Sequence, residues 1–206
     1  PSPAWKRKRF KMPWYTGETV IAGIGQGYWK VTPLQLAQGT ASLANGGHRI
    51  PLRLVSETRT GFDQPWKPLP KLAGTSIGAT PEQLQAIKTG MLATMHSRRG
   101  TGWAIAAGSP YLIAGKTGTV QKISRRGSVS HDPKSLPLHL RHQALFIGYA
   151  PADNPKIAVV VVVEHGGYGA SSAGPIARKM MDAYLLKPEP ALPLPIAEQN
   201  PEVSDD

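Results

Sequence analysis

The chain has 206 residues, a formal net charge of +11 and a hydrophobic fraction of 40%. This length suits one domain with a sizeable core, or a large part of one. The absence of cysteine excludes disulfides, thiolate nucleophiles and cysteine-ligated zinc. The longest apolar run, Ile157 to Val163, is far shorter than the ~20 residues of a membrane helix.

The two ends of the chain differ in charge. The first residues, Pro1 to Lys11, are basic and contain neither a methionine nor the apolar region of a signal peptide. We therefore expect a piece of a longer protein, with any membrane anchor upstream. Residues 187–206 are acidic and rich in proline, which predicts a disordered tail after a domain at 1–186. The positive net charge is the one feature that favours nucleic-acid binding, and the sequence contains no recognisable nucleic-acid-binding motif. We therefore do not expect nucleic acid as a partner.

The first predicted helix begins with a capping box. Thr32 is the N-cap residue, Pro33 the first helical residue and Gln35 the side chain that completes the box. Asn45-Gly46-Gly47 ends the helix. Its expected buried face consists of Leu36, Ala37, Thr40, Leu43 and Ala44.

A second helix repeats the same signature with Thr80, Pro81 and Gln83. Its expected buried stripe consists of Leu84, Ile87, Met91 and Met95.

Three strands are predicted, around Tyr111 to Val120, at 142–150 and at 156–164. The last two flank PADNP, a tight turn, and we expect all three to pair in this order. The final strand is apolar at every position from 157 to 163, which predicts a central strand covered on both faces. A helix follows that has Ile176, Met180 and Tyr184 on one face. This order predicts a mixed α and β fold with an antiparallel sheet and helices packed on it.

The first of these strands contains Gly115-Lys116-Thr117, which resembles the end of a phosphate-binding P-loop. A P-loop also needs a glycine at position 110, where Pro110 stands, and a helix after the motif, which the β-branched residues there disfavour. GIGQGYW at 23–29 imitates a dinucleotide-binding motif, but Tyr28 replaces its last glycine. We therefore do not expect nucleotide binding.

On a strand, the same residues suit an acyl-transfer site. Alternation places Lys116 and Gly118 on one face and Thr117 and Thr119 on the other. Such a strand offers a cation, two hydroxyl donors and a glycine that lets a substrate approach. These groups suit an acyl donor with a free carboxylate, and a strand N–H can stabilise an oxyanion.

Three features occur together: AGKTGT on a strand, IGQG before a Thr-Pro-capped helix, and a strand pair ending in EHGG before a last helix. This combination resembles the C-terminal part of a class B penicillin-binding protein transpeptidase domain. WKRKRFKMPWY, GIGQGYW and HDPKSLPLHLRHQALFIGYAP are most similar to the penicillin-binding protein 2 group, the transpeptidases of cell elongation. The resemblance covers about residues 5 to 186. It implies the serine β-lactamase/penicillin-binding transpeptidase fold, an antiparallel sheet sandwiched by helices, incomplete at its N-terminal side.

The resemblance also implies roles for single residues. Lys116 would join the proton-transfer network and attract the terminal carboxylate of the substrate. Thr117 and Thr119 would hydrogen-bond that carboxylate, and Gly118 would keep the strand accessible. The N–H of Thr119 would form half of the oxyanion hole. Lys116 and Thr119 are therefore the catalytic candidates, and Thr117, Gly118 and Thr119 bind substrate.

The nucleophile of the family is missing from the chain. No serine is followed by lysine three residues later, as the Ser-x-x-Lys motif requires. Ser130-His131-Asp132 and Ser204-Asp205-Asp206 match the second motif of the family only formally, because they follow Lys-Thr-Gly instead of preceding it. We expect both motifs upstream of Pro1, and the chain alone to be inactive.

The resemblance implies a parent D,D-transpeptidase that cross-links peptidoglycan stem peptides ending in D-Ala-D-Ala through an acyl-serine, and that β-lactams acylate. It implies no metal or organic cofactor, a bacterial inner-membrane anchor with the domain in the periplasm, and a membrane glycosyltransferase partner. Two alternatives stay open: a related D,D-carboxypeptidase or β-lactamase, and an inactive truncated remnant. The sequence upstream of Pro1 distinguishes them.

Overall fold

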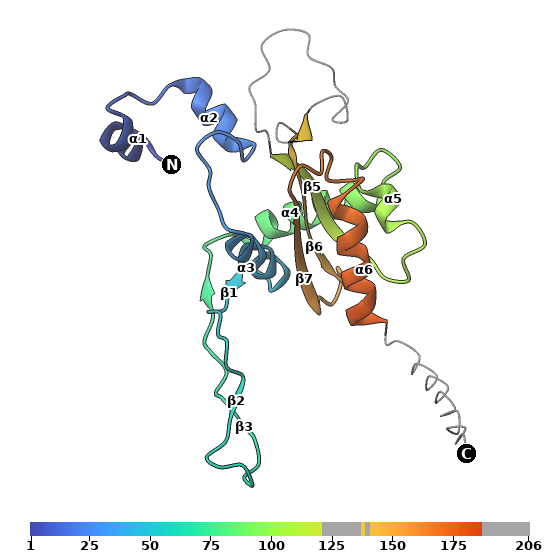
Figure 1. Ribbon diagram of the computed structural model, residues 1–206. Helices are drawn as coiled ribbons and strands as arrows, with labels where there is room; N and C mark the ends of the chain where they lie inside the picture. Colours follow the sequence, from blue (N-terminus) through green and yellow to red (C-terminus); the bar gives the residue numbers. More distant parts are fainter. Residues whose placement is uncertain (121–136, 139–140, 187–206) are drawn as a thin grey trace, which may run out of the picture.

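The structure, a computed structural model, describes residues 1–120, 137–138 and 141–186. Figure 1 shows three parts: a body around a sheet, an N-terminal segment of two helices, and a long arm. The tail predicted at 187–206 and the formal motif match at Ser130 lie outside the described residues. Within the described ranges, no helix has the length and apolarity needed to cross a bilayer.

The body is built on an antiparallel sheet of β5 (Ala114–Val120), β6 (Gln143–Ala150) and β7 (Ile157–Val163), in that order. The predicted pairing of the three strands is confirmed. The first strand begins at Ala114 and not at Tyr111, the expected start. The short connection between β6 and β7 fixes their register, in which Ala150 lies opposite Ile157.

The predicted cover of the last strand on both faces is confirmed, but within the described sheet this strand is not central. β6 is central, and β7 lies at an edge of the sheet that the structure describes. α3 (Pro33–Ala44) and α6 (Ala173–Leu185) both contact β7. The unbroken apolar run of β7 therefore reflects two covered faces and not two paired neighbours.

Helices cover both faces of the sheet. α3 and α4 (Pro81–His96) lie on one side, and α6 lies on the other with α5 (Trp103–Ala106) beside it (Figure 1). Two hydrophobic clusters fill the layers. One joins the sheet to α6 through Phe146, Val161 and Met181, and the other contains Met91 and Tyr149. The predicted antiparallel sheet between helices is confirmed.

Both predicted capping boxes are present. The Thr32 hydroxyl accepts the N–H of Gln35 at 3.1 Å, and the Gln35 side chain accepts the N–H of Thr32 at 2.9 Å. Thr80 and Gln83 form the same pair of bonds at the start of α4. α3 ends at Ala44, as the Asn-Gly-Gly sequence predicted. On its predicted face Thr40 is buried and the other four side chains are half-buried.

The buried faces of the other two helices differ from the prediction. In α4, Met91 and Met95 are buried, but Ile87 is 42% exposed. The C-terminal half of α4 packs against the body, and the turn that carries Ile87 does not. In α6, the predicted face is solvent-exposed: Ile176, Met180 and Tyr184. The buried face lies one residue further along the helix and consists of Ala173, Gly174, Ala177 and Met181.

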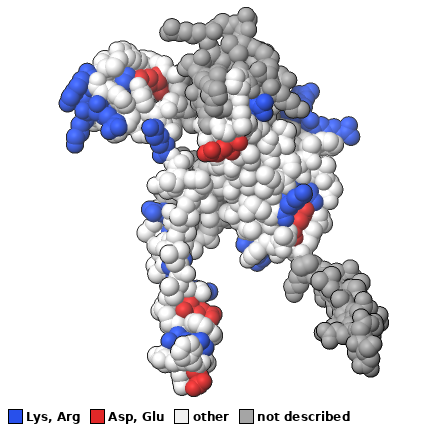
Figure 2. Space-filling model, in the orientation of Figure 1, with Lys and Arg blue, Asp and Glu red and all other residues white. Residues whose placement is uncertain are grey.

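The N-terminal segment and the arm contain elements that the sequence did not predict. α1 (Pro3–Phe10) and α2 (Thr16–Gly23) are joined by an ion pair of 2.6 Å between Lys6 and Glu18. Lys and Arg side chains gather over this segment in Figure 2. The arm consists of two short antiparallel ribbons: β1 (His48–Arg49) with β4 (Thr75–Ser76), and β2 (Glu57–Thr58) with β3 (Lys67–Pro68).

Candidate active site

The candidate residues line the outer edge of β5. In an antiparallel pair, each residue directs its N–H and its C=O to the same side of the strand. The carbonyl oxygens of Thr117 and Thr119 accept bonds from the side chains of Lys116 and Gln26, neither of which belongs to β6. Thr117 and Thr119 therefore turn their backbone groups to the open edge of the sheet, away from β6.

Lys116 brings a cation to this edge. Its side chain is exposed, and its Nζ donates a hydrogen bond of 2.7 Å to the Thr117 carbonyl. Lys116 lies opposite Ile147, while its neighbour Thr117 lies opposite Phe146 on the other face of the sheet. The ammonium group is thus held beside the strand, where it can attract an anionic ligand that lies along β5.

Thr117 is only 9% exposed, and its hydroxyl is bonded within the protein. Its Oγ1 lies 2.7 Å from the Oγ1 of Thr101, which belongs to the turn before α5. A side chain at Gly100 would collide with the Thr94 carbonyl, so glycine is needed for this turn. A hydroxyl has one donor and two acceptor sites. When Thr101 donates to Thr117, the hydrogen of Thr117 is free to point to a ligand.

Gly118 and Thr119 complete the strand motif. A Cβ at Gly118 would come within 3.2 Å of the Leu145 side chain on β6. A side chain at Gly169 would in turn meet the Gly118 backbone. The sheet therefore has a packing reason for glycine at position 118, beside the access to substrate that the sequence suggested. Thr119 is half-buried, and its N–H faces the open edge.

Three residues that the sequence analysis missed hold β5 in place. Gln26 donates to the Thr119 carbonyl at 3.1 Å, and Thr101 contacts Thr117. His96, at the end of α4, accepts the N–H of Ile113 through Nε2 at 3.0 Å, just before the strand begins. Gln26 and Thr101 share a sequence signal, because each stands between two glycines.

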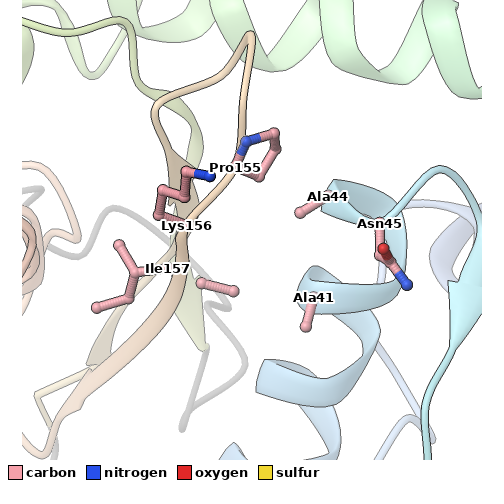
Figure 3. Close-up of a pocket in the computed structure, with 7 residues that line it drawn as sticks. Ala41, Ala44, Asn45, Pro155, Lys156 and Ile157 are labelled. Atoms are coloured by element: carbon pink, nitrogen blue, oxygen red, sulfur yellow. The ribbon is translucent and has the colours of Figure 1, made fainter. Parts of the chain in front are cut away.

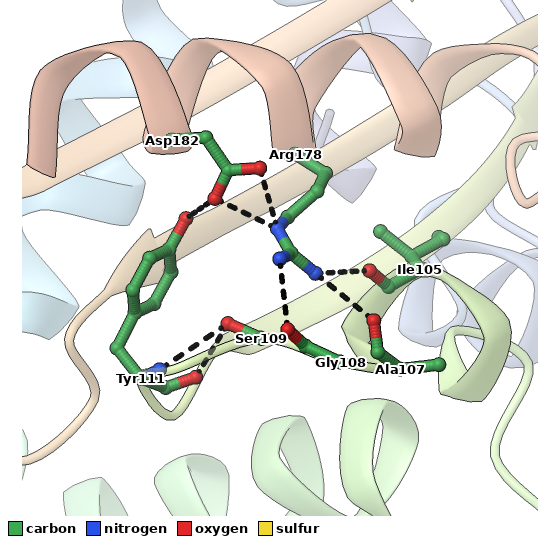
Figure 4. A network of polar contacts seen from close by, with 7 residues as sticks. All are labelled: Ile105, Ala107, Gly108, Ser109, Tyr111, Arg178 and Asp182. Carbon is green, nitrogen blue, oxygen red and sulfur yellow. Dashed lines mark hydrogen bonds and ion pairs between the residues drawn. The ribbon is translucent and has the colours of Figure 1, made fainter. Parts of the chain in front are cut away.

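A polar network holds the approach to β5 against α6 (Figure 4). The Tyr111 hydroxyl donates to Asp182 at 2.5 Å, and Arg178 Nε donates to both oxygens of the same carboxylate at 2.9 Å. Arg178 also donates to the carbonyls of Ile105, Ala107 and Gly108. The residues that lead into β5 are thereby fixed to the helix that covers the sheet.

Ionisation within this network follows from its contacts. Burial, and then the hydrogen bond to Asp182, raise the pKa of Tyr111 to about 12. Burial would raise the pKa of Asp182, but the bonds from Tyr111 and Arg178 outweigh it and lower that pKa below its usual value. Asp182 is thus a carboxylate and Tyr111 a neutral donor at neutral pH.

A surface hollow elsewhere in the body does not belong to this site. It has a volume of about 150 Å³ and lies between α3 and the start of β7 (Figure 3), lined by Ala41, Ala44, Asn45 and residues 155–158. None of these residues is on β5.

Within the described ranges, no group of three or more His, Asp or Glu side chains is placed to hold a metal ion.

The similarity of the chain to known proteins covers far more than β5. The model of the family described as "Penicillin binding protein transpeptidase domain" matches residues 6–182. The peptidoglycan D,D-transpeptidase MrdA of Haemophilus influenzae is 39% identical over 188 residues, which are 90% of this chain and 28% of that protein. The chain thus spans less than a third of the length of this curated relative.

Two solved structures are similar to the fold. PBP2 of Pseudomonas aeruginosa in complex with WCK 5153 is 41% identical, with a TM-score of 0.68 over 91% of this chain and 37% of that chain. PBP2 of Helicobacter pylori, solved in complex with MreC, is 29% identical, with a TM-score of 0.65 over 91% of this chain and 31% of that chain. The similarity therefore includes the N-terminal segment and the arm as well as the sheet.

Proposed function

The chain belongs to the penicillin-binding protein transpeptidase family, and from this premise we propose that it is the C-terminal portion of a peptidoglycan D,D-transpeptidase of the PBP2 type. The observation that carries the proposal is the open edge of β5. There the Lys116 ammonium lies beside the strand, and the Thr119 N–H faces outward. A cation and a strand N–H on one edge suit a peptide with a terminal carboxylate and a reacting carbonyl.

The proposed reaction has two acyl transfers. A serine attacks the carbonyl of the penultimate D-Ala of a stem peptide and forms an ester, and the terminal D-Ala leaves with a proton. An amine of a second stem then attacks the ester, which forms the cross-link and restores the serine hydroxyl. No serine of this chain has a lysine three residues later, so the nucleophile comes from a segment upstream of Pro1 in the longer protein.

The strand residues take distinct roles in this reaction. Lys116 attracts the carboxylate of the stem peptide and takes part in proton transfer with the serine. Thr117 and Thr119 donate their hydroxyls to that carboxylate, and Gly118 leaves space for the peptide. The Thr119 N–H stabilises the oxyanion that develops on the carbonyl oxygen. No step of this sequence requires a metal ion or an organic cofactor.

The longer protein would be placed where its substrate is made. We propose that a segment upstream anchors it in a bacterial inner membrane and that the transpeptidase domain, which includes residues 1–186, faces the periplasm. Residues 187–206 would form a tail after the domain. A membrane glycosyltransferase would supply glycan strands. The Helicobacter pylori relative was solved with MreC, and a partner of this kind is proposed here too.

The test uses the full-length protein that includes this chain. Incubation with excess β-lactam and intact-mass measurement should show one covalent adduct, mapped by peptide digestion to a serine upstream of Pro1. The 206-residue chain alone should show none, because a nucleophile must lie within reach of its base. An adduct on a serine of these 206 residues would contradict the proposal.

Product analysis separates the alternatives. With stem peptides and an amine acceptor, a transpeptidase forms the cross-linked dimer, whereas a carboxypeptidase only releases D-Ala and a β-lactamase returns hydrolysed β-lactam. A stop codon directly upstream in the gene would identify a remnant.

A further inference from the structure

We propose that Gln26 is a positioning residue of the transpeptidase site, which fixes Thr119 so that its N–H points at the developing oxyanion. This inference rests on the proposed function, because it assigns a role within that same site. Gln26 belongs to the N-terminal segment, far from β5 in the sequence. It is linked to the strand by a single side-chain bond.

The first argument is the geometry of this bond. Gln26 Nε2 donates to the carbonyl oxygen of Thr119 at 3.1 Å, and the Gln26 side chain is half-buried. That carbonyl is on the open edge of β5, where no partner strand among the described residues supplies a donor. The side chain therefore takes the place of a neighbouring strand at this one position.

The second argument is the turn that presents Gln26. Gly25 and Gly27 flank it with φ angles of 77° and 79°, a left-handed conformation that favours glycine. The Gln26 N–H donates to the carbonyl of Ile21 at 3.1 Å. A Cβ at Gly27 would lie only 3.0 Å from the Ile21 side chain. The backbone is thus folded tightly back on the end of α2, and the glutamine side chain projects from it.

The third argument is the anchoring of this turn. The Tyr28 hydroxyl, one residue beyond Gly27, donates to Glu18 Oε1 at 3.1 Å. The same oxygen of Glu18 accepts the bond from Lys6, whose side chain is almost completely buried. The rings of Trp5 and Phe10 pack around Tyr28 with centroid distances of 5.3 and 5.5 Å. The turn is therefore fixed on both sides, as a positioning residue requires.

The consequence for chemistry follows from strand geometry. The N–H and C=O of Thr119 point to the same side of β5, so a bond that fixes the carbonyl also restricts the direction of the N–H. Without it, the end of the strand can rotate, and the donor loses alignment with the oxyanion. Removal of an oxyanion donor slows acyl transfer by about 10²- to 10³-fold. Loss of its positioning should cost less, about tenfold to hundredfold.

The bond also selects what the edge can bind. Lys116 and Gln26 donate to two of the outward carbonyls, those of Thr117 and Thr119. Each of these two carbonyls thereby has one donor, and the N–H groups of Thr117 and Thr119 remain as donors. These donors suit the carboxylate and the carbonyl oxygen of an acyl donor.

The experiment measures acylation of the full-length protein by a fluorescent penicillin, and separates the dissociation constant of the initial complex from the acylation rate constant. Gln26→Ala removes the donor. Gln26→Glu keeps the shape but replaces the amide by a carboxylate, which cannot donate to the carbonyl and is repelled by it. Both variants should acylate about tenfold to hundredfold more slowly, with the dissociation constant unchanged within about threefold.

A matched control is present in the chain. Gln38 Nε2 donates to the carbonyl of Ile50, also at 3.1 Å, at the base of the arm. Gln38→Ala removes the same kind of bond at a place remote from β5, and should leave the acylation rate constant within about twofold of wild type. Titration of active sites with unlabelled penicillin corrects each rate for misfolded protein.

The outcomes distinguish the proposals. If the wild-type protein is not acylated at all, the proposed function fails. If wild type is acylated and the Gln26 variants match it in rate constant, the positioning role is overturned. It is also overturned if Gln26→Ala lowers only the active fraction, or if Gln38→Ala slows acylation equally, because either result shows a general effect on folding.

Discussion

The two outer edges of the described sheet differ in what they offer to another molecule. At β5, the side chains of Lys116 and Gln26 bond the outward carbonyls of Thr117 and Thr119. At β7, the strand is a run of aliphatic residues from Ile157 to Val163, and Val162 is 38% exposed. The β5 edge therefore suits a small polar ligand. In the part of the chain that the structure describes, β7 has no partner strand on its outer side. An apolar edge of this kind pairs readily with another strand.

The largest expected effect concerns the cation of the β5 edge. In the full-length protein, Lys116→Ala should slow acylation by a labelled penicillin about hundredfold or more, because a charge that stabilises the transition state is lost. The melting temperature should stay nearly the same, since an exposed lysine contributes little to stability. Acylation rates measured by stopped-flow fluorescence check this.

The matched variant lies at the opposite edge. Lys156 is exposed and directly precedes β7, and Lys156→Ala should acylate like wild type. Equal acylation rates for Lys116→Ala and wild type would show that the Lys116 cation has no role in acylation at the β5 edge.

The next effect concerns Thr101, which contacts the same strand from the other face. Thr101→Val keeps the branched shape but removes the hydroxyl that lies 2.7 Å from Thr117 Oγ1. The Thr117 hydroxyl should then rotate away from the ligand, and acylation should slow by about tenfold, the equivalent of one neutral hydrogen bond of ~1.4 kcal/mol. Thr101→Ser should restore most of the rate. A Thr101→Ser rate as low as that of Thr101→Val would point to packing of the methyl group instead.

A third prediction tests the β7 edge. The 206-residue chain should self-associate, with size-exclusion elution that depends on concentration, because β7 is aliphatic and has no partner strand on one side of the described sheet. Val162→Lys should shift the chain towards monomer. Val120, on β5, has a similar exposed fraction of 39%, and Val120→Lys is the matched control. Equal shifts for the two variants would show that added charge, and not the β7 edge, controls association.

Local signals in the sequence predicted much of this fold. The capping boxes at Thr32 and Thr80 depend on residues three positions apart, so both helix starts were predicted correctly. The pairing of the strands followed from their β-pattern and from the short turn at 151–155. The Lys-Thr-Gly-Thr residues lie on a strand, as predicted, although this strand begins at Ala114 and not at Tyr111.

The predictions were wrong where the packing of whole helices against the sheet determines which side chains are buried. Spacing identifies residues that share a helix face, but only packing decides which face is buried. Ile176 and Met180 do share a face of α6, and the sheet packs against Ala173 and Ala177 instead, since small side chains let the helix approach closely. Ile87 of α4 is exposed because the turn that carries it does not pack against the body.

The contacts of Gln26 and Thr101 could not be predicted from one sequence, because they join segments far apart along the chain. Gln26 and Thr119 are separated by 93 positions. A glycine on each side of a polar residue was the one local sign, present at both positions, that a side chain is presented by a tight turn.

The smallest expected effect concerns Asp182, which fixes the approach to β5 against α6, the helix that also packs on β7. Burial opposes ionisation of Asp182, but Tyr111 and Arg178 hold its pKa below the ordinary value of 3.8. A carboxyl group with a lowered pKa in the folded state stabilises the fold above its unfolded pKa, and this contribution is lost as the pH falls through the folded value. At pH 7, Asp182→Asn should therefore lower the melting temperature of the full-length protein by a few degrees, about 1 kcal/mol. The difference should narrow as the pH falls below 3.8 and through the lower pKa of the folded protein, because the carboxyl group then becomes neutral in both states. Asp153, exposed in the turn before β7, supplies the control, and Asp153→Asn should not change the melting temperature at pH 7. A difference between wild type and Asp182→Asn that does not narrow over this pH range would mean that shape, and not charge, accounts for the role of Asp182.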